Sequence, residues 1–291
     1  FVTEVAFRLR VPVTPTVALS GFPRGLSELP GTPFLLVHGL ASNARLWDGV
    51  AEELVRLGHP SIAIDLRGHG RAAKTDDGYD FGTLATDLVA VIDEMDIETP
   101  IAVGQSWGGN VVMELAARHP DRIRGVVGVD GGTIELSAQL PEWQQASTEL
   151  APPDLLGTPV TEVEAWIRRA HPDWPESGIE GTLANFQVLG DGTILPRLSR
   201  EHHMKILREL WEHHPARLYP QIRVPVLLQV AAPAGEDATR TALRRASVDA
   251  AQLAIGRCSV EWFSPADHDL HAQFPERCAR SLAAFATSIA G

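Results

Sequence analysis

Residues 100–120 read PIAVGQSWGGNVVMELAARHP. The apolar run over 100–106 predicts a β-strand, and the pattern over 111–120, which stops at Pro120, predicts a helix. Between them lies Gly104-Gln105-Ser106-Trp107-Gly108, so Ser106 falls on a tight turn from strand to helix. Such a turn crowds the residues two positions to either side, which explains the glycines. It also places a helix start, with free N–H groups, behind negative charge that develops beside Ser106.

Working outward from this turn, short strand patterns alternate with longer helical patterns. Strands are predicted over 4–10, 16–20, 33–39, 59–65, 100–106, 124–130, 224–232 and 259–264. Helices are predicted over 80–95, 111–120, 238–254 and 276–289. This rhythm is typical of an α/β fold, and it predicts an eight-stranded, mostly parallel sheet with helices on both faces.

The alternation breaks between about residues 133 and 220, where Pro-interrupted helical pieces occur without a strand pattern. We therefore predict three parts: a core over 1–132, a helical lid insertion over 133–220 and the rest of the core over 221–291. One lid helix has a predicted start, because Thr161 and Glu164 have the spacing of a capping box. Trp166 lies on the apolar stripe of that helix, and we expect it to pack.

The composition excludes several classes of function. The net charge is −12 and the basic residues are scattered, so a nucleic-acid partner is not expected. No run of 18 apolar residues occurs, so we expect a soluble protein without a membrane span. The first ten residues lack the pattern of a signal peptide, which makes a cytoplasmic location the expectation. Cys258 and Cys278 lack the spacing of a metal site, and no metal is expected.

Other motifs join the serine turn. His38-Gly39 follows the third predicted strand, Asp-Leu-Arg-Gly-His-Gly follows the fourth at 65–70, and His268 comes after the last strand, seven residues before Pro275. With these motifs the chain resembles the serine hydrolase branch of the α/β-hydrolase fold family over about residues 30–133 and 220–291. The lid has no counterpart in this resemblance.

The resemblance implies roles for individual residues. Ser106 would be the nucleophile and His268 the general base, with His271 as its nearest competitor. The oxyanion hole would be formed by the backbone N–H groups of Leu40 and Trp107.

The acid of the triad has two candidate positions. Most of the family places it after the seventh strand, but there this chain reads Ala-Ala-Pro-Ala-Gly, and Glu236 and Asp237 come late. A second placement, at the tip of the sixth strand, occurs in some haloalkane dehalogenases and zearalenone-type lactonases. Here Asp130 ends that strand and two glycines follow. We favour Asp130 and keep Glu236 and Asp237 as alternatives.

A serine nucleophile argues against epoxide opening and dehalogenation, which use an aspartate in this fold. We expect hydrolysis of a carboxylic ester or lactone of a small apolar substrate through an acyl-enzyme, without a cofactor. A thioesterase, an amidase similar to prolyl iminopeptidase, a cofactor-free haloperoxidase or lyase, and a non-catalytic ligand-binding protein remain alternatives. Trp143 and Trp174 are candidates for the substrate pocket, and packing is the alternative for both. The oligomeric state stays open.

Overall fold

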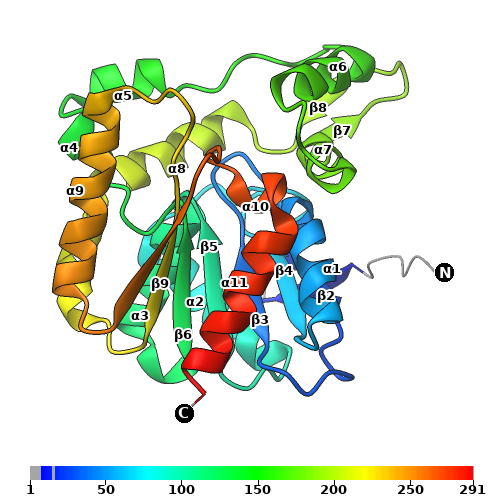
Figure 1. Cartoon of the computed structure of the whole chain (residues 1–291). Helices are drawn as coiled ribbons and strands as arrows, with labels where there is room; N and C mark the ends of the chain where they lie inside the picture. The colour runs from blue at the N-terminus through cyan, green and yellow to red at the C-terminus, as the bar shows by residue number, and fades with distance from the viewer. Residues whose placement is uncertain (1–7, 15–16, 291) are drawn as a thin grey trace.

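The computed structural model describes residues 8–14 and 17–290, which build one eight-stranded sheet with the order β1-β2-β4-β3-β5-β6-β9-β10 (Figure 1). Its strands are β1 (Leu9–Pro12), β2 (Ala18–Arg24), β3 (Phe34–Val37), β4 (Ser61–Asp65), β5 (Ile101–Gln105), β6 (Gly125–Val129), β9 (Val226–Ala231) and β10 (Cys258–Phe263). β2 pairs antiparallel with β1 and β4, and all other pairs are parallel. The predicted strands are confirmed, except that positions 4–7 and 16 lie outside the described residues.

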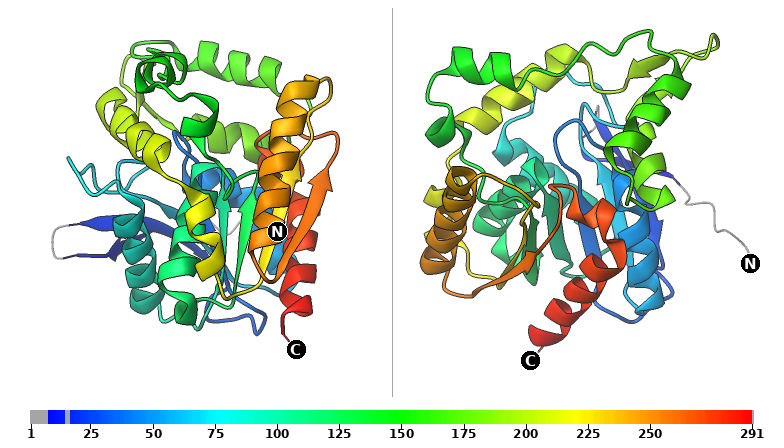
Figure 2. Two further views of the ribbon diagram at one scale, coloured as in Figure 1. Left: turned by 90° about the vertical axis from the view of Figure 1, so that its left-hand side faces the viewer. Right: turned by 45° about the horizontal axis from the view of Figure 1, so that its top comes forward.

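Helices cover both faces of this sheet, as predicted. The central strands are buried along their whole length and alternate between two apolar clusters, because successive side chains of a strand point to opposite faces. One cluster includes α2 (Phe81–Glu94), α3 (Trp107–Arg118) and α9 (Ala238–Ala254). The other includes α1 (Asp48–Arg56) and α11 (Pro275–Ser288), which pack on each other. The views of Figure 2 show these layers from two further directions.

Most of the segment between β6 and β9 lies beyond the end of the sheet where β6 terminates, at the top of Figure 1. It contains α4 (Leu136–Gln139), α5 (Trp143–Glu149), α6 (Val160–Ala170), α7 (Glu176–Leu183) and α8 (Arg200–Glu212). The predicted boundaries at 133 and 220, and the role of this insertion as a lid, stay predictions.

The expectation that this insertion holds no strand is wrong. A hairpin of β7 (Phe186–Val188) and β8 (Ile194–Pro196) lies between α7 and α8. Its turn uses Gly192 at φ +81°, and the Asp191 carboxylate accepts from the N–H of Thr193 at 3.0 Å. An Asp-Gly turn between two short apolar runs is the hairpin signal that was available in the sequence.

Two predictions for α6 are also wrong. The helix begins at Val160, with Pro159 at the N-cap, so Thr161 lies inside it and forms no capping box. The N–H of Val160 donates to the carbonyl of Gly192 at 3.0 Å, so the hairpin takes the place of a side-chain cap. Trp166 is 54% exposed, because the buried side of this helix is the one that carries Val163 and Ile167.

No helix within residues 8–14 and 17–290 combines the length and the apolar character needed to cross a membrane.

Candidate active site

Ser106 lies at the end of β5 and forms the N-cap of α3. Its backbone adopts φ 53° and ψ −123°, a conformation that non-glycine residues rarely take. Its N–H donates to the carbonyl of Val129 at 3.0 Å, and its carbonyl accepts from the N–H of Gly109 at 2.9 Å. The strained serine is thus held between the tip of β6 and the first turn of α3.

The glycines around Ser106 are required by close backbone contacts. A Cβ on Gly104 would lie 2.1 Å from the carbonyl oxygen of Gly108, and one on Gly108 would lie 2.3 Å from that of His38. A Cβ on Gly131, after β6, would lie 2.3 Å from the carbonyl oxygen of Ser106. Only glycine leaves room for such approaches.

Backbone strain is concentrated here. Of the five non-glycine residues with positive φ in the described part of the chain, three lie at this site: Ala41, Ser106 and Asp130. Such conformations cost free energy and cluster at functional sites. Ala41 follows Leu40 in the loop after β3, and Ser106 precedes Trp107. The two segments proposed for the oxyanion hole are therefore both strained, and Asp130 adds strain at the tip of β6.

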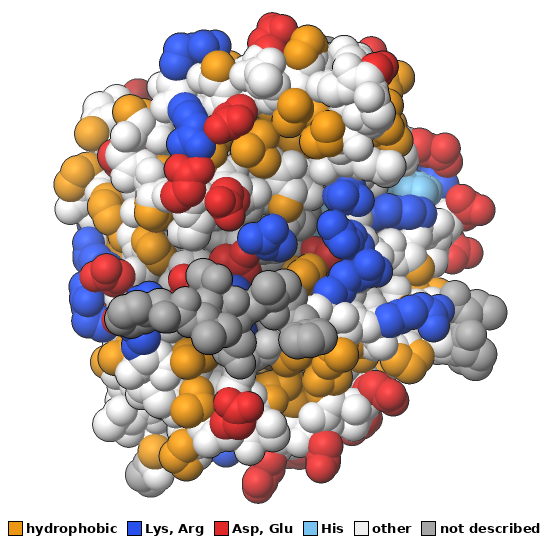
Figure 3. Space-filling view, turned by 90° about the vertical axis from the view of Figure 1, so that its right-hand side faces the viewer, with side chains coloured by type: hydrophobic (Ala, Val, Ile, Leu, Met, Phe, Trp, Pro, Cys, Tyr) orange, Lys and Arg blue, Asp and Glu red, His pale blue; other side chains and the backbone are white. Residues whose placement is uncertain are grey.

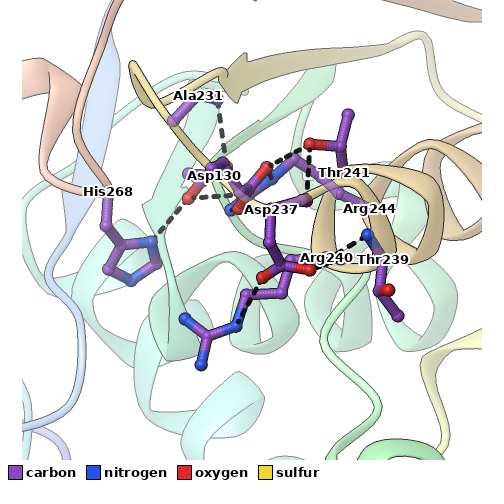
Figure 4. Close-up of polar contacts among 9 residues, drawn as sticks. Asp130, Ala231, Asp237, Thr239, Arg240, Thr241, Arg244 and His268 are labelled. Atoms are coloured by element: carbon purple, nitrogen blue, oxygen red, sulfur yellow. Dashed lines mark hydrogen bonds and ion pairs between the residues drawn. The ribbon is translucent and has the colours of Figure 1, made fainter.

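His268 and Asp130 meet beside this serine turn. Nδ1 of His268 lies 2.5 Å from Oδ2 of Asp130, and Figure 4 shows the carboxylate between the histidine and α9. The Asp130 side chain is only 4% exposed, whereas that of His268 is 52% exposed. A buried carboxylate on Nδ1 leaves Nε2 as the free nitrogen of the ring.

The electrostatic environment favours positive charge on His268. Burial lowers the pKa of this imidazole, but the hydrogen bond and the charge of Asp130 outweigh burial, so the pKa lies above its ordinary value. The charge of Asp269 acts in the same direction, and that of Arg244 opposes it. Such a ring can take up a proton from a neighbouring hydroxyl.

The competitor His271 lies in a different environment, in α10 (Leu270–Gln273). It is 1% exposed, and its ring packs 4.3 Å from that of Trp47, measured between centroids. Neither ring nitrogen has a partner among the described residues. Burial and the charge of His268 lower the pKa of His271 to about 3, so it stays neutral and is unsuited to accept a proton near pH 7.

Glu236 and Asp237 make their contacts elsewhere. Asp237 is the N-cap of α9 and accepts from the N–H groups of Thr239 and Arg240, both at 3.0 Å. Glu236 pairs with Arg244 at 2.8 Å. Of the three candidate acids, Asp130 is therefore the one whose carboxylate bonds to His268.

The backbone positions expected to form an oxyanion hole lie next to Ser106. Trp107 is the first residue of α3, where an N–H has no partner within the helix. The N–H of Leu40 makes no hydrogen bond within the part of the chain that the structure describes. A Cβ on Gly39, the residue before it, would lie 3.2 Å from Cβ of Ser106. The two N–H groups are thus available near the serine.

The loop of Leu40 is held by two buried, neutral histidines. Nε2 of His38 accepts from the N–H of Leu66 at 3.0 Å, and Nε2 of His69 accepts from the N–H of Ala41 at 3.3 Å. Burial lowers the pKa of both rings, which keeps them uncharged and able to accept these bonds. These histidines support the loop rather than supplying protons.

Two polar residues of the site were missed by the sequence analysis. Gln105 is buried and donates to the carbonyl of His268 at 3.4 Å, so it ties the serine turn to the histidine loop. Its signal was a polar residue at the end of an apolar strand. Arg244 binds Asp130 with Nη1 at 2.9 and 3.1 Å. It lies 114 positions from Asp130, and no local pattern marks it.

A cavity of about 690 Å³ opens beside His268 and Asp130, between α4, α5 and α9. Its wall combines apolar side chains, such as Leu136, Leu140, Leu228 and Val230, with charged ones, such as Glu149, Glu236, Arg240 and Arg244. A second, small pocket of about 120 Å³ is lined by Ala41 and Ser42 of the loop after β3.

Neither tryptophan proposed for the pocket lines these two cavities. Trp143 packs against Trp211, and Trp174 is buried against His171 with ring centroids 3.9 Å apart. The structure therefore places both in packing contacts, which was the alternative for each.

A third cavity, of about 660 Å³, lies away from the serine, between β2, α1 and α7. It is lined by five arginines and by four carboxylates: Arg8, Arg24, Arg45, Arg71, Arg197, Asp48, Glu52, Asp65 and Glu180. Figure 3 shows basic side chains gathered on this face of the molecule. No residue of the candidate triad lines it.

The described residues contain no group of three or more His, Cys, Asp or Glu side chains arranged to hold a metal ion.

Comparisons with known proteins agree with this architecture. Residues 32–162 match the family model described as alpha/beta hydrolase fold. A non-heme chloroperoxidase of Kitasatospora aureofaciens is 35% identical over 98 residues, which are 33% of this chain and 36% of that protein. Epoxide hydrolase B of Mycobacterium tuberculosis is 36% identical over 101 residues, 34% of this chain and 28% of that protein. The matches thus span about a third of the length of these curated relatives.

Among solved structures, E-2-(acetamidomethylene)succinate hydrolase superposes with a TM-score of 0.75. The alignment covers 96% of this chain and 98% of that one, at 24% identity. A likeness of this extent covers the insertion as well as the sheet, and it shows a shared fold.

Proposed function

We propose that this chain, which has the alpha/beta hydrolase fold, is a serine hydrolase that cleaves a carboxylic ester or lactone. The observation that carries the proposal is the buried Asp130 carboxylate, 2.5 Å from Nδ1 of a half-exposed His268, beside a serine on a strained turn. These are the three groups that nucleophilic acyl transfer requires, each from a different segment of the chain.

In the proposed mechanism, Ser106 Oγ attacks the carbonyl carbon while Nε2 of His268 takes the hydroxyl proton. Asp130 holds the ring by Nδ1 and stabilises the imidazolium that forms. The proton is then passed to the leaving oxygen, the ester C–O bond breaks, and an acyl group remains on Ser106. Water, deprotonated by the same histidine, hydrolyses this acyl-enzyme and returns the serine.

The negative charge on the carbonyl oxygen would be stabilised by the N–H groups of Trp107 and Leu40. Loss of one such donor typically costs about 10²–10³ in kcat. The hydrogen bond from the N–H of Ala41 to Nε2 of His69 supports this assignment, because it holds the loop that carries the N–H of Leu40.

We assign the leaving group to the cavity of about 690 Å³, because His268, which must protonate the leaving oxygen, lines that cavity. The leucine and valine side chains in its wall suit the apolar part of an alcohol or the ring of a lactone. This placement is the reason to favour an ester or lactone over the thioester and amide alternatives.

The test is labelling with a serine-directed fluorophosphonate, followed by mapping of the labelled peptide, together with hydrolysis of p-nitrophenyl acetate and of a small lactone. We expect one label on Ser106, turnover of at least one substrate, and no effect of a chelator. Absence of labelling at Ser106 in folded protein, or inactivation by a chelator reversed by zinc, would reject the proposal.

A cofactor-free haloperoxidase is the second candidate, because a relative at 35% identity bears the name of a non-heme chloroperoxidase. Halogenation of a test substrate with hydrogen peroxide and bromide, exceeding ester hydrolysis by the same preparation, would favour it. A protein that binds a ligand without catalysis would show neither reaction and no label.

A further inference from the structure

Asp130 lies in an unusually complete polar environment for a carboxylate at the tip of a strand. Its N–H donates to the carbonyl of Gln229 at 2.7 Å, which fastens the residue to β9. Oδ1 accepts from the N–H of Ala231 at 3.0 Å and from Arg244 Nη1 at 2.9 Å, and Oδ2 contacts His268. One side of the carboxylate is therefore held by α9 and β9, and the other faces the histidine (Figure 4).

Arg244 is itself held by a second carboxylate. Its Nη2 bonds to Oε1 of Glu236 at 2.8 Å, and Glu236 also accepts from the hydroxyl of Thr241 at 3.2 Å. The side chains are 27% exposed for Arg244 and 12% for Glu236. The guanidinium thus bridges two nearly buried carboxylates, one from the tip of β6 and one from the loop after β9.

We propose that Arg244 is a positioning residue for the reaction: its guanidinium holds the Asp130 carboxylate in line with His268, and its charge, moderated by Glu236, limits how strongly Asp130 favours the protonated histidine. This inference rests on the proposed triad. Glu236 lies in the loop after β9, beyond the position at which the family resemblance places an acid, and it pairs with the arginine.

A positive charge beside Asp130 is needed because this carboxylate is buried. A carboxylate removed from water interacts strongly with a neighbouring imidazole, and the pKa of His268 is already raised. A base whose pKa is raised too far stays protonated near pH 7 and cannot accept the serine proton. Arg244 lowers the pKa of His268 and so counteracts Asp130.

Other titratable groups facing His268 do not supply this counter-charge. Asp269, on its own loop, raises the pKa of His268 further. His271 remains neutral, as described above, and the charge of His171 acts on Asp269. Arg244 is the opposing cation that acts on this ring.

The test compares three variants with a matched control. Arg244→Gln removes the positive charge and the planar guanidinium that bonds to both carboxylates. Arg244→Lys keeps the positive charge but not the guanidinium. Glu236→Gln removes the negative charge that pairs with Arg244. The control is Arg245→Gln, which removes an exposed arginine next in the same helix, where its guanidinium lies over the ring of Trp262. For each, the rate of fluorophosphonate labelling and of p-nitrophenyl acetate hydrolysis is measured from pH 5 to 9.

We expect the acidic midpoint of Arg244→Gln to move up by about 1 pH unit, which is the shift that a nearby charge commonly causes. Glu236→Gln should move it down, by about half a unit. Arg244→Lys should keep the wild-type midpoint with a lower plateau rate, because a lysine cannot reproduce the fork geometry. Arg245→Gln should match the wild type in both.

Identical midpoints for Arg244→Gln and wild type, or shifts of Arg244→Gln and Glu236→Gln in the same direction, would overturn the inference. NMR titration of the His268 ring measures its pKa without catalysis. It therefore tests the effect of Arg244 on His268 even if the wild type is not labelled. If Ser106 of the wild type is not labelled, the proposed hydrolase function fails. The NMR titration then still tests whether Arg244 lowers the pKa of His268. If Arg244→Gln does not fold, Glu236→Gln and Arg244→Lys carry the test.

Discussion

Oδ2 of Asp130 lies 2.5 Å from Nδ1 of His268, although 138 positions separate the two residues in the chain. Asp130 follows β6 and His268 follows β10, and these strands are separated in the sheet only by β9. The carboxyl ends of neighbouring parallel strands share one edge, which is where ligands bind in sheets of this class. The contact therefore forms at the edge that also presents Ser106.

The first prediction concerns the nucleophile. Ser106→Ala should reduce ester hydrolysis by more than tenfold and abolish fluorophosphonate labelling, because it removes the hydroxyl that attacks. The fold should persist, since no core packing is lost, and circular dichroism checks this. Ser147→Ala, on α5, removes a hydroxyl that bonds only to Gln144 and serves as the control. Retention of more than a tenth of the rate by Ser106→Ala would show that the serine is not the nucleophile.

The second prediction separates the candidate acids. Asp130→Asn should lower kcat by up to about 10⁴, because the imidazolium loses its partner and the ring its orientation. Asp237→Asn should keep most of the activity, since this carboxylate caps α9. Steady-state kinetics on one ester compares the two variants with the wild type. The reverse order of damage would move the acid to the loop after β9.

The third prediction concerns pH. Since the pKa of His268 is raised, the acidic midpoint of kcat/KM should lie above about 6.5, the ordinary value for histidine. Activity then rises with pH as the ring loses its proton. The stability change has the opposite sign: the protonated ring stabilises the fold at pH below about 6.5, and this contribution is lost as pH rises through the folded-state pKa.

Two profiles check this third prediction. One is kcat/KM against pH, and the other is the difference in Tm between wild type and His268→Gln across the same range. The Tm difference should be largest at low pH and shrink towards pH 9. A midpoint below 6, or a Tm difference that grows with pH, contradicts the raised pKa.

The fourth prediction tests the backbone contact between the tip of β6 and the serine turn. Gly131→Ala would place a Cβ 2.3 Å from the carbonyl oxygen of Ser106, so the two segments must separate. We expect a loss of about 1–3 kcal/mol in the free energy of unfolding, as overpacking commonly causes, and slower labelling of Ser106. Urea unfolding measures the first effect. Gly190→Ala is the matched control, because a Cβ there meets no atom within 4 Å.

The fifth prediction tests the assignment of the leaving group. Ser247→Trp adds bulk to the α9 wall of the cavity of about 690 Å³. It should lower kcat/KM about tenfold or more for esters of bulky alcohols, because the cavity must then exclude them. Methyl esters of the same acid provide the internal control and should be hydrolysed nearly as before. An equal loss for both series would place the leaving group elsewhere.

Much of this fold could be predicted from local patterns. The eight strands and four of the five helices that cover the sheet follow from periodicity, whereas α1 was not predicted. Ser106 follows from glycines at 104 and 108 that only a tight turn requires. Where local signals conflicted, the prediction failed. The hairpin after α7 was missed because its strands are three residues long, and Trp166 was assigned to the wrong face of α6.

What the sequence determined by itself is the set of elements and the position of the serine, because strand, helix and turn propensities act over a few neighbouring residues. Only the tertiary structure decided which carboxylate meets His268, because that depends on the order of strands in the sheet and on where α9 directs its side chains. The sequence favoured Asp130, which ends a strand before two glycines, but it left Glu236 and Asp237 open as alternatives. Folding gives them different partners: His268 and Arg244 for Asp130, Arg244 for Glu236, and the start of α9 for Asp237.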